Sequence, residues 1–166
     1  QELIGRVPNA SAEEMTDAIT AAKEASKAWK KTSQKQRVAL IEEIAQRLEA
    51  RADEFAKIEA LDTGNTVGPM TNDVHKAVER MRFYCGLAYE LKGMTVPSTP
   101  ENIHLTLREP YGVVGRIIPF NHPIGFAASR IAPALIAGNT IVVKPSEQAP
   151  LSASLLAEIC AEVAPP

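Results

Sequence analysis

The sequence predicts an α/β protein in which helices precede a βαβα portion of a parallel sheet. A continuous apolar run over residues 113–118 is typical of a strand buried on both faces, as parallel strands are. A second β-rich run follows at residues 140–143, and an apolar segment from Ile124 to Gly138 has helical length. We expect Gly138 to end that helix and the βαβ crossover to be right-handed.

Polar side chains follow both predicted strands. Asn121 lies in a turn between two prolines just after the first strand, and Lys144, Ser146 and Glu147 follow the second. Ligands of open α/β sheets bind at the carboxyl ends of the strands. A lysine and a glutamate three residues apart can hydrogen-bond neighbouring hydroxyl groups of one ribose. From the spacing alone, however, an exposed ion pair without a ligand is the favoured interpretation.

Helices are predicted both before and after the strands. Capping boxes at residues 11–14 and 33–36 begin two helices, the second of which runs on to Gly64. A third is expected over residues 72–92 and a fourth after Pro150. We interpret their apolar stripes as core, with a partner surface as the alternative for the first two. The stripes comprise Met15, Ala18, Ile19, Ala22, Ala25 and Trp29; Val38, Ile41, Ile44, Ala45, Leu48, Ala52, Phe55 and Ile58; Val74, Ala77, Val78, Met81, Cys85 and Ala88; and Leu151, Leu155, Ile159 and Val163.

A different type of strand is expected over residues 103–108. Its apolar and polar residues alternate strictly, which predicts a half-buried antiparallel strand, whereas residues 93–101 have the composition of a loop. The change of strand type across Glu109 and Pro110 indicates that the chain leaves one sheet and enters another. Residues 61–65 are expected to form a turn.

Composition narrows the function classes. The chain has 166 residues, of which 45% are hydrophobic and 23% charged, and its formal net charge is −2. This balance gives no reason to expect nucleic acid or a membrane as partner. Cys85 and Cys160 do not form a disulfide framework; we interpret both as inert core residues in a cytoplasmic protein. No second ligand at metal spacing accompanies His75, so no metal site is expected.

The predicted sheet is too small to stand alone. Two parallel strands do not make a stable doubly wound sheet, so an incomplete domain is expected. Residues 2–8 look like the second half of a hairpin, and Pro165-Pro166 follows the last helix abruptly.

Several motifs together resemble those of the aldehyde dehydrogenase superfamily. They are Gly112-Val-Val-Gly-Arg-Ile-Ile-Pro-Phe-Asn-His-Pro123, Ala134-Leu-Ile-Ala-Gly-Asn139, Val142-Val-Lys-Pro-Ser-Glu-Gln148, Leu61-Asp-Thr-Gly-Asn65 and Leu107-Arg-Glu-Pro110. The resemblance spans essentially the whole chain. It implies an N-terminal helical part of the cofactor-binding domain (1–93), a strand of an oligomerisation arm (94–110), and the first βαβα unit of a Rossmann-like NAD(P)-binding domain (111–166).

The resemblance also implies roles for individual residues. Asn121 matches the amide that stabilises the oxyanion, and Lys144 and Glu147 match the pair that holds the adenine ribose. NAD is the expected cofactor and NADP stays open, because Ser146 could help accept a 2′-phosphate that Glu147 would repel. The strand end that would contact the cofactor comprises Ile117, Ile118, Pro119 and Phe120. The aldehyde tunnel would be lined by His122, Phe126 and Ser129, for which ordinary helix packing is the alternative.

The implied activity is the NAD(P)-dependent oxidation of an aldehyde to a carboxylic acid through a cysteine thiohemiacetal and thioester, by a homodimer or homotetramer. In the family, the nucleophilic cysteine and the general-base glutamate lie downstream of the Lys-Pro-Ser-Glu block, outside these residues. Two alternatives therefore stay open. One is a non-catalytic nucleotide-binding or dimerising fragment, and the other is a CoA-acylating relative.

Overall fold

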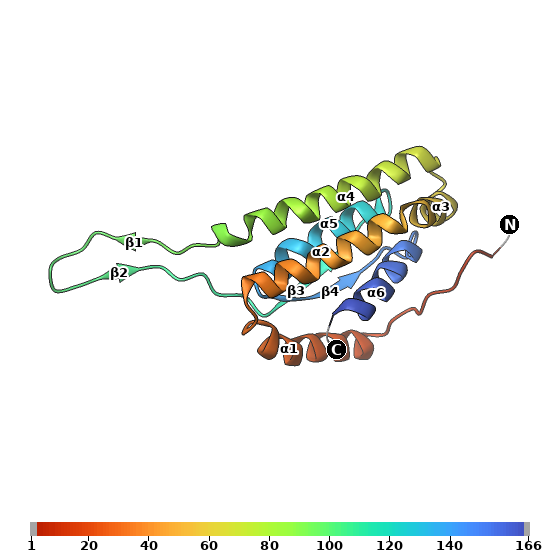
Figure 1. Ribbon diagram of the computed structural model, residues 1–166. Coiled ribbons are helices and arrows are strands. Elements are labelled where there is room, and N and C mark those ends of the chain that lie inside the picture. The colour runs from red at the N-terminus through yellow and green to blue at the C-terminus, as the bar shows by residue number, and fades with distance from the viewer. Residues whose placement is uncertain (1–2, 165–166) are drawn as a thin grey trace.

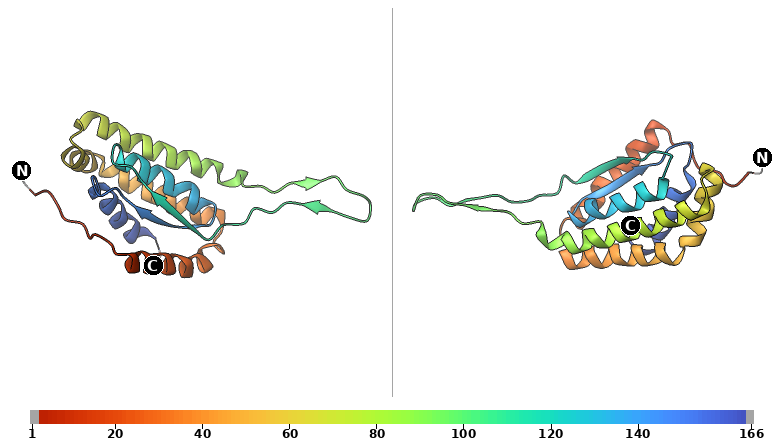
Figure 2. Two further views of the ribbon diagram at one scale, coloured as in Figure 1. Left: turned by 180° about the vertical axis from the view of Figure 1, so that it is seen from behind. Right: turned by 90° about the horizontal axis from the view of Figure 1, so that it is seen from above.

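The computed structural model describes residues 3–164. Its elements are α1 (Ala12–Trp29), α2 (Gln34–Ala50), α3 (Ala52–Thr63), α4 (Val67–Leu87), the 3-10 turn η1 (Ala88–Glu90), β1 (Thr95–Val96), β2 (His104–Leu105), β3 (Val113–Ile117), α5 (Pro123–Ile136), β4 (Thr140–Lys144) and α6 (Leu151–Val163). β3 and β4 pair in parallel, with α1 on one side and α5 on the other, and α2 and α4 lie outside α5 (Figures 1 and 2). The predicted α/β class is confirmed.

The predicted starts of the first two helices are confirmed by their hydrogen bonds. Ser11 Oγ accepts from the amide of Glu14, whose carboxylate accepts from the Ser11 amide in return. The same reciprocal pair joins Ser33 and Gln36 at the start of α2. Each box satisfies two amides that the first helical turn leaves without intrahelical partners.

The expected single helix from residue 34 to Gly64 is wrong, because the chain breaks it at Arg51. Arg51 has φ −104° and ψ 17°, and its guanidinium pairs with Glu54. The apolar stripe continues across the break, since Leu48 of α2 and Phe55 of α3 enter the same core. Periodicity alone therefore could not reveal it. Gly64, with φ 79°, does end α3 as predicted.

Other helix boundaries also differ from those predicted from the sequence. Residues 61–63 belong to α3 rather than to a turn, and α4 begins at Val67, before the expected residue 72. Pro69 is tolerated in α4 because amides in a first turn need no intrahelical acceptor. At the end of α5, Gly138 has φ 87°, and a Cβ there would lie 2.7 Å from Arg37 Nη1. The predicted helix end at Gly138 is confirmed.

One core joins α2, α3, α4, α5 and α6. The fully buried side chains include Ile41, Ile44, Leu48, Phe55, Val74, Met81, Ile124 and Ile159. Cys85 is buried in this core and Cys160 borders it. Burial raises the pKa of Cys85 to about 12 and that of Cys160 to about 11, so both thiols stay protonated, as their inert interpretation requires.

Two predicted stripes needed correction. α1 contributes no fully buried residue: Ala22, Ala25 and Trp29 are half-buried and line an open apolar cavity of about 740 Å³ between α1, β4 and α6. Ile19 is 45% exposed. In α6 the buried positions are Ser152, Leu156 and Ile159. The inward face of α6 differs from the predicted one because Ser152 Oγ donates a hydrogen bond to the buried Glu59 carboxylate of α3.

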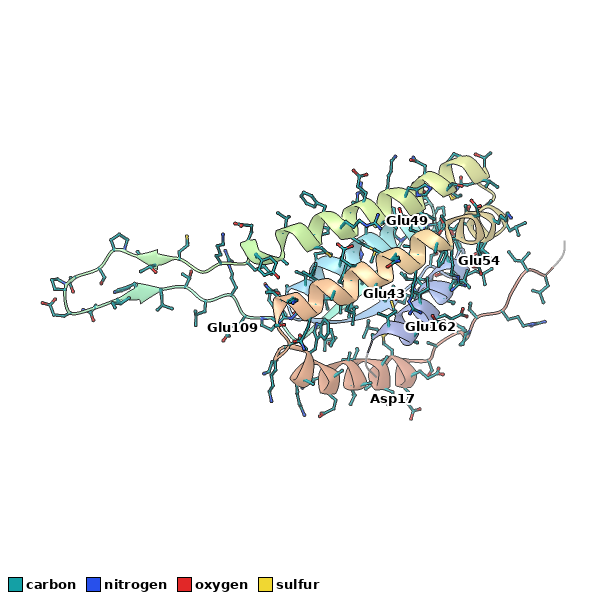
Figure 3. All side chains as sticks on the ribbon, viewed as in Figure 1. Asp17, Glu43, Glu49, Glu54, Glu109 and Glu162 are labelled. Atoms are coloured by element: carbon teal, nitrogen blue, oxygen red, sulfur yellow. The ribbon has the colours of Figure 1, made fainter. Side chains whose placement is uncertain are left out.

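Glu43, Glu49, Glu54 and Glu162 lie on the outside of the helices (Figure 3). Arg47 of α2 pairs with Glu162 of α6 at 2.6 Å, and Arg82 of α4 pairs with Glu49 of α2 at 2.7 Å. These pairs are solvent-exposed and stabilise the fold by at most about 1 kcal/mol each. The helices are therefore held together mainly by the apolar core.

The strands are more exposed than expected. β3 pairs with β4 on one edge only, and Ile117 is 77% exposed, so the prediction of burial on both faces is wrong. The half-buried strand at 103–108 is wrong as well. Only His104–Leu105 form β2, paired antiparallel with β1 inside the expected loop, and both strands are exposed because this hairpin projects away from the body (Figures 1 and 2).

At the amino end, residues 3–10 form no strand, while Glu2 and Pro165-Pro166 lie outside the described residues. Among residues 3–164, no helix is both long and apolar enough to cross a bilayer.

Candidate functional site

The carboxyl ends of β3 and β4 meet at one edge of the sheet. Ile117 pairs with Lys144 in the parallel register, and the Ile118 amide donates to the Lys144 carbonyl at 3.1 Å. From this edge, residues 119–122 lead into α5 and residues 145–150 lead into α6. The structure therefore brings Asn121 and the Lys144–Glu147 segment to the same edge, as the strand pattern predicts.

Lys144 and Glu147 form an exposed pair at this edge. Their Nζ and Oε2 atoms lie 3.3 Å apart, and the two side chains are 47% and 82% exposed. The Glu147 backbone amide and the Lys144 ammonium hold the pKa of the Glu147 carboxyl below its usual value. Glu147 is thus a charged acceptor at neutral pH, beside a cationic donor. Ser146 Oγ accepts from the Gln148 amide at 3.2 Å.

The end of β3 offers an apolar surface beside that pair. Ile117 is 77% and Phe120 53% exposed, and Pro119 is exposed too. Ile118 is 2% exposed and belongs to the core instead. The strand-end residues named from sequence therefore divide into three that face solvent and one that supports them from below.

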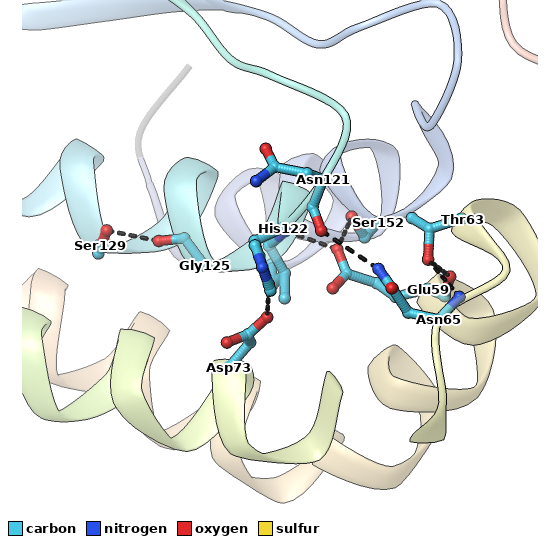
Figure 4. A network of polar contacts seen from close by, with 10 residues as sticks. Glu59, Thr63, Asn65, Asp73, Asn121, His122, Gly125, Ser129 and Ser152 are labelled. Carbon is cyan, nitrogen blue, oxygen red and sulfur yellow. Dashed lines mark hydrogen bonds and ion pairs between the residues drawn. The ribbon is translucent and has the colours of Figure 1, made fainter. Parts of the chain in front are cut away.

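Asn121 presents its side chain to solvent. Its backbone carbonyl accepts from Asn65 Nδ2 at 3.2 Å, and its side-chain amide points away from this contact (Figure 4). Within residues 3–164 that amide has no hydrogen-bond partner. An Asn held by its backbone with a free side-chain N–H is suited to donate to an anionic oxygen.

The three residues predicted to line a tunnel have different environments. His122 Nδ1 lies 2.5 Å from Asp73 Oδ2, and the His122 side chain is 47% exposed. Phe126 is half-buried. Ser129 is fully buried, and its hydroxyl donates to the Gly125 carbonyl within α5. Only His122 therefore combines exposure with a free polar atom.

Sequence reasoning missed Glu59, a buried carboxylate that contacts the start of α5. Its Oε1 accepts from the Ile124 amide at 2.5 Å and from Ser152 Oγ at 2.7 Å, and the residue is 1% exposed (Figure 4). Burial raises the pKa of its carboxyl to about 7, against the opposing effect of these two hydrogen bonds. A signal was present, because Glu59 follows Phe55 at i+4 and therefore lies on the core-facing side of α3.

A second carboxylate of α3 holds the start of α6. Asp62 Oδ2 accepts from the Leu151 amide at 3.0 Å, and Asp62 is half-buried. The helices that follow β3 and β4 are therefore both anchored to α3 by carboxylates three residues apart.

The sequence model of the aldehyde dehydrogenase family matches residues 1–166. The chain belongs to the aldehyde dehydrogenase family. The resemblance carried by its motifs is thereby confirmed.

This aldehyde dehydrogenase chain is 39% identical over 168 residues to aldehyde dehydrogenase tropH of Talaromyces stipitatus, covering 99% of this chain and 33% of the relative. PnpE from Pseudomonas sp. WBC-3 is 36% identical, with a TM-score of 0.94 over 99% of this chain and 34% of that structure. A betaine aldehyde dehydrogenase double mutant from Staphylococcus aureus, in complex with NAD+, is 32% identical, with a TM-score of 0.94 over 100% of this chain and 34% of that structure. The chain spans about a third of the length of these relatives.

A further solved structure is bound to the phosphorylated cofactor. NADP-dependent glyceraldehyde-3-phosphate dehydrogenase from Bacillus halodurans, in complex with NADP, is 35% identical, with a TM-score of 0.90 over 96% of this chain and 35% of that structure. Similar structures therefore include complexes with NAD+ and a complex with NADP.

In this aldehyde dehydrogenase chain, apolar and charged side chains are exposed together at the carboxyl end of the sheet. Ile117 and Phe120 present exposed apolar side chains there, and Lys144 and Glu147 add a hydrogen-bond donor beside an acceptor. Among the described residues, no group of three or more His, Cys, Asp or Glu could hold a metal ion.

Proposed function

We propose that this chain forms the N-terminal part of an NAD(P)-dependent aldehyde dehydrogenase that oxidises an aldehyde to a carboxylic acid. One observation carries the proposal: the side-chain amide of Asn121, which has no hydrogen-bond partner in the described part of the chain, lies at the same sheet edge as the Lys144–Glu147 pair. A donor for a developing oxyanion and a pair suited to a ribose thus occur together.

In this proposal Asn121 acts on the aldehyde oxygen. When a nucleophile attacks a carbonyl carbon, that oxygen gathers negative charge, and a preplaced N–H lowers the barrier. The Asn65 contact fixes the Asn121 backbone, so its side chain can meet the oxygen with little reorganisation. Asn121 is therefore the catalytic residue that we assign within this chain.

Lys144 and Glu147 would hold the adenine ribose of the cofactor, whose nicotinamide when bound accepts the hydride of the reaction. Ile117, Pro119 and Phe120 would contact it, and Ile118 would support them from the core. The charge of Glu147 favours NAD, because a carboxylate repels a 2′-phosphate. NADP use would require Glu147 to turn away and Ser146 to donate to the phosphate.

The remaining assignments follow the motifs. We place His122 and Phe126 beside the path of the aldehyde, with Ser129 contributing only its small size. We also propose that the projecting hairpin within 94–110 is an arm toward a second copy in a homodimer or homotetramer, and that 1–93 and 111–166 belong to the cofactor-binding domain. The exposed apolar residues of the hairpin, among them Val96, Ile103, Leu105 and Leu107, support such an arm.

The test is Asn121→Ala in the full-length gene product. Turnover should fall by about 10²–10³-fold, as when one oxyanion donor is removed, while the dissociation constant of NAD changes little. Asn72→Ala is the matched control, because Asn72 is exposed on α4. Turnover of Asn121→Ala equal to that of the control would refute the assignment.

A non-catalytic nucleotide-binding or dimerising role is the second candidate. It is favoured by the two protonated thiols, since neither Cys85 nor Cys160 can act as a nucleophile at neutral pH. The intact mass and the NAD-reduction activity of the gene product separate the candidates. A mass well above that of 166 residues with aldehyde-dependent NADH formation supports the enzyme, and dependence of that activity on added CoA would indicate an acylating relative.

A further inference from the structure

The start of α5 lacks the usual means of helix capping. Pro123, at its first position, has no N–H, and the side chain of the N-cap residue His122 makes no capping hydrogen bond. The first free amide of the helix, that of Ile124, donates to Glu59 Oε1 instead. The turn that carries Asn121 is therefore held by a residue 65 positions away in the chain.

Glu59 connects three elements at one buried point. From α3 it accepts hydrogen bonds from the Ile124 amide of α5 and the Ser152 hydroxyl of α6. Its second oxygen, Oε2, is buried and has no hydrogen-bond partner among residues 3–164. A buried carboxylate with an unpaired oxygen costs folding free energy that an apolar side chain of similar size would not. Its placement therefore points to a purpose other than stability.

The Asn121 turn has three tethers, and the Glu59 tether is the buried one. The Asn65 side chain donates to the Asn121 carbonyl, and Asp73 pairs with His122; both contacts involve exposed partners. Water competes for those two contacts but not for the Glu59–Ile124 bond. Because Ile124 lies three residues after Asn121, a shift of the helix start would displace the Asn121 side chain directly.

We propose that Glu59 is a positioning residue, whose carboxylate fixes the start of α5 and thereby the direction of the Asn121 side-chain amide. This inference rests on the proposed function of Asn121. Without an acceptor at Glu59, the Ile124 amide is left unsatisfied and the turn relaxes. A displacement of about 1 Å at a catalytic group lowers turnover by about 10²-fold.

Protonation of Glu59 tunes this contact near neutral pH. The charged groups that act on it are Asp73 from α4, which raises its pKa, and His122 from the turn, which lowers it; α6 presents only the neutral Ser152. With burial as the largest cause, the pKa is about 7. The ionised carboxylate accepts the stronger hydrogen bond from Ile124, so alignment of Asn121 improves as the pH rises through 7.

The experiment measures kcat, KM and the pH profile of the full-length gene product with Glu59→Ala, Glu59→Gln and the exposed charge-loss control Glu158→Gln. Glu59→Ala should lower kcat by about 10- to 100-fold with the NAD dissociation constant unchanged. Glu59→Gln keeps an acceptor oxygen, so it should retain most turnover and lose the limb of the kcat profile near pH 7. The control should keep both.

A double-variant cycle separates this inference from the proposed function. If Glu59 acts through Asn121, Asn121→Ala combined with Glu59→Ala should be no slower than Asn121→Ala alone. Additive losses, or a Glu59→Gln enzyme that keeps the limb near pH 7, would overturn the positioning role. If Asn121→Ala itself keeps full turnover, the proposed function fails instead. Should Glu59→Ala not fold, the Glu59→Gln pH profile decides alone.

Discussion

The turns after β3 and β4 lead into helices whose starts are held in the same way but in different surroundings. Each helix presents an early amide to a carboxylate of α3: Ile124 to Glu59 at 2.5 Å, and Leu151 to Asp62 at 3.0 Å. Glu59 is 1% exposed, whereas Asp62 is half-buried. Both carboxylates accept the same kind of hydrogen bond. Burial disfavours the charged form of Glu59 and thereby raises its pKa to about 7, so this carboxylate also binds a proton near neutral pH.

The two turns also present different chemistry. The turn before α5 carries one free amide, which in our proposal must meet a reacting oxygen with sub-ångström accuracy. The segment before α6 carries an exposed ion pair, which in our proposal only has to bind a sugar. The more deeply buried anchor therefore belongs to the turn that needs the more accurate placement.

The largest expected difference between the two anchors is in stability. A carboxyl whose folded pKa is raised from 4.5 to about 7 stabilises the fold fully below pH 4.5 and loses that contribution as the pH rises through 7. The loss is on the order of 3 kcal/mol. Denaturant titrations at pH 5 and pH 8 should show wild type losing most of that amount relative to Glu59→Gln; parallel pH dependences of the two proteins would contradict the raised pKa of Glu59.

The next effect tests whether the segment before α6 binds the cofactor while the turn before α5 acts in catalysis, as we propose. Lys144→Ala should weaken NAD binding by about 10- to 100-fold, since a charge-assisted hydrogen bond is lost, and should alter kcat much less. Fluorescence titration with NAD measures the former, with Lys57→Ala of α3 as the control. If Lys144→Ala lowered only kcat, the roles that we assign to the two turns would have to be exchanged.

Removing the second anchor should have a smaller consequence. Asp62→Ala deletes the acceptor of the Leu151 amide and should cost about 1 kcal/mol of unfolding free energy, as the loss of a helix cap does. Because α6 follows the Lys144–Glu147 segment, NAD affinity should change more than kcat. An Asp62→Ala enzyme with reduced kcat and normal NAD affinity would show that α6 also positions Asn121.

The smallest effect is expected at the exposed tether of the Asn121 turn. Asn65→Ala removes the donor to the Asn121 carbonyl and should lower kcat by about 2- to 10-fold, because a solvent-accessible hydrogen bond contributes only about 1 kcal/mol. Steady-state kinetics beside Glu59→Ala would rank the two tethers. A larger loss at Asn65 would make the exposed contact, rather than the buried one, the main support.

Local signals predicted the parts of this fold that local contacts determine. The capping boxes at Ser11 and Ser33, the end of α5 at Gly138 and the parallel pairing of β3 with β4 all follow from short-range patterns. The break at Arg51 did not, because both helices that it separates turn the same apolar stripe to one core. The exposure of the two short hairpin strands was not predicted either. Alternation of apolar and polar residues indicates that one face of a strand is buried, but here no other element of the described chain packs against that face.

In the candidate site, too, the residues near the strand ends could be predicted from the sequence and the long-range contacts could not. Asn121, Lys144 and Glu147 could be named from motifs because they lie at or within a few residues of the strand ends. The apolar stripe could indicate that Glu59 is buried, but not its role, which arises from contacts with Ile124 and Ser152, 65 and 93 residues away. A buried glutamate on an apolar stripe is the pattern to look for, together with a distant helix that begins at a proline without its own cap.

The two protonated thiols have a practical consequence for chemical labelling. With pKa values of about 12 and 11, Cys85 and Cys160 carry a thiolate fraction of about 10⁻⁴ or less at neutral pH, and alkylating probes react with the thiolate. We therefore expect neither cysteine within residues 3–164 to react appreciably with such probes in the native protein. A maleimide or iodoacetamide adduct that forms within minutes on the native gene product would mark a cysteine elsewhere in it, and protection of that cysteine by an aldehyde would locate the nucleophile.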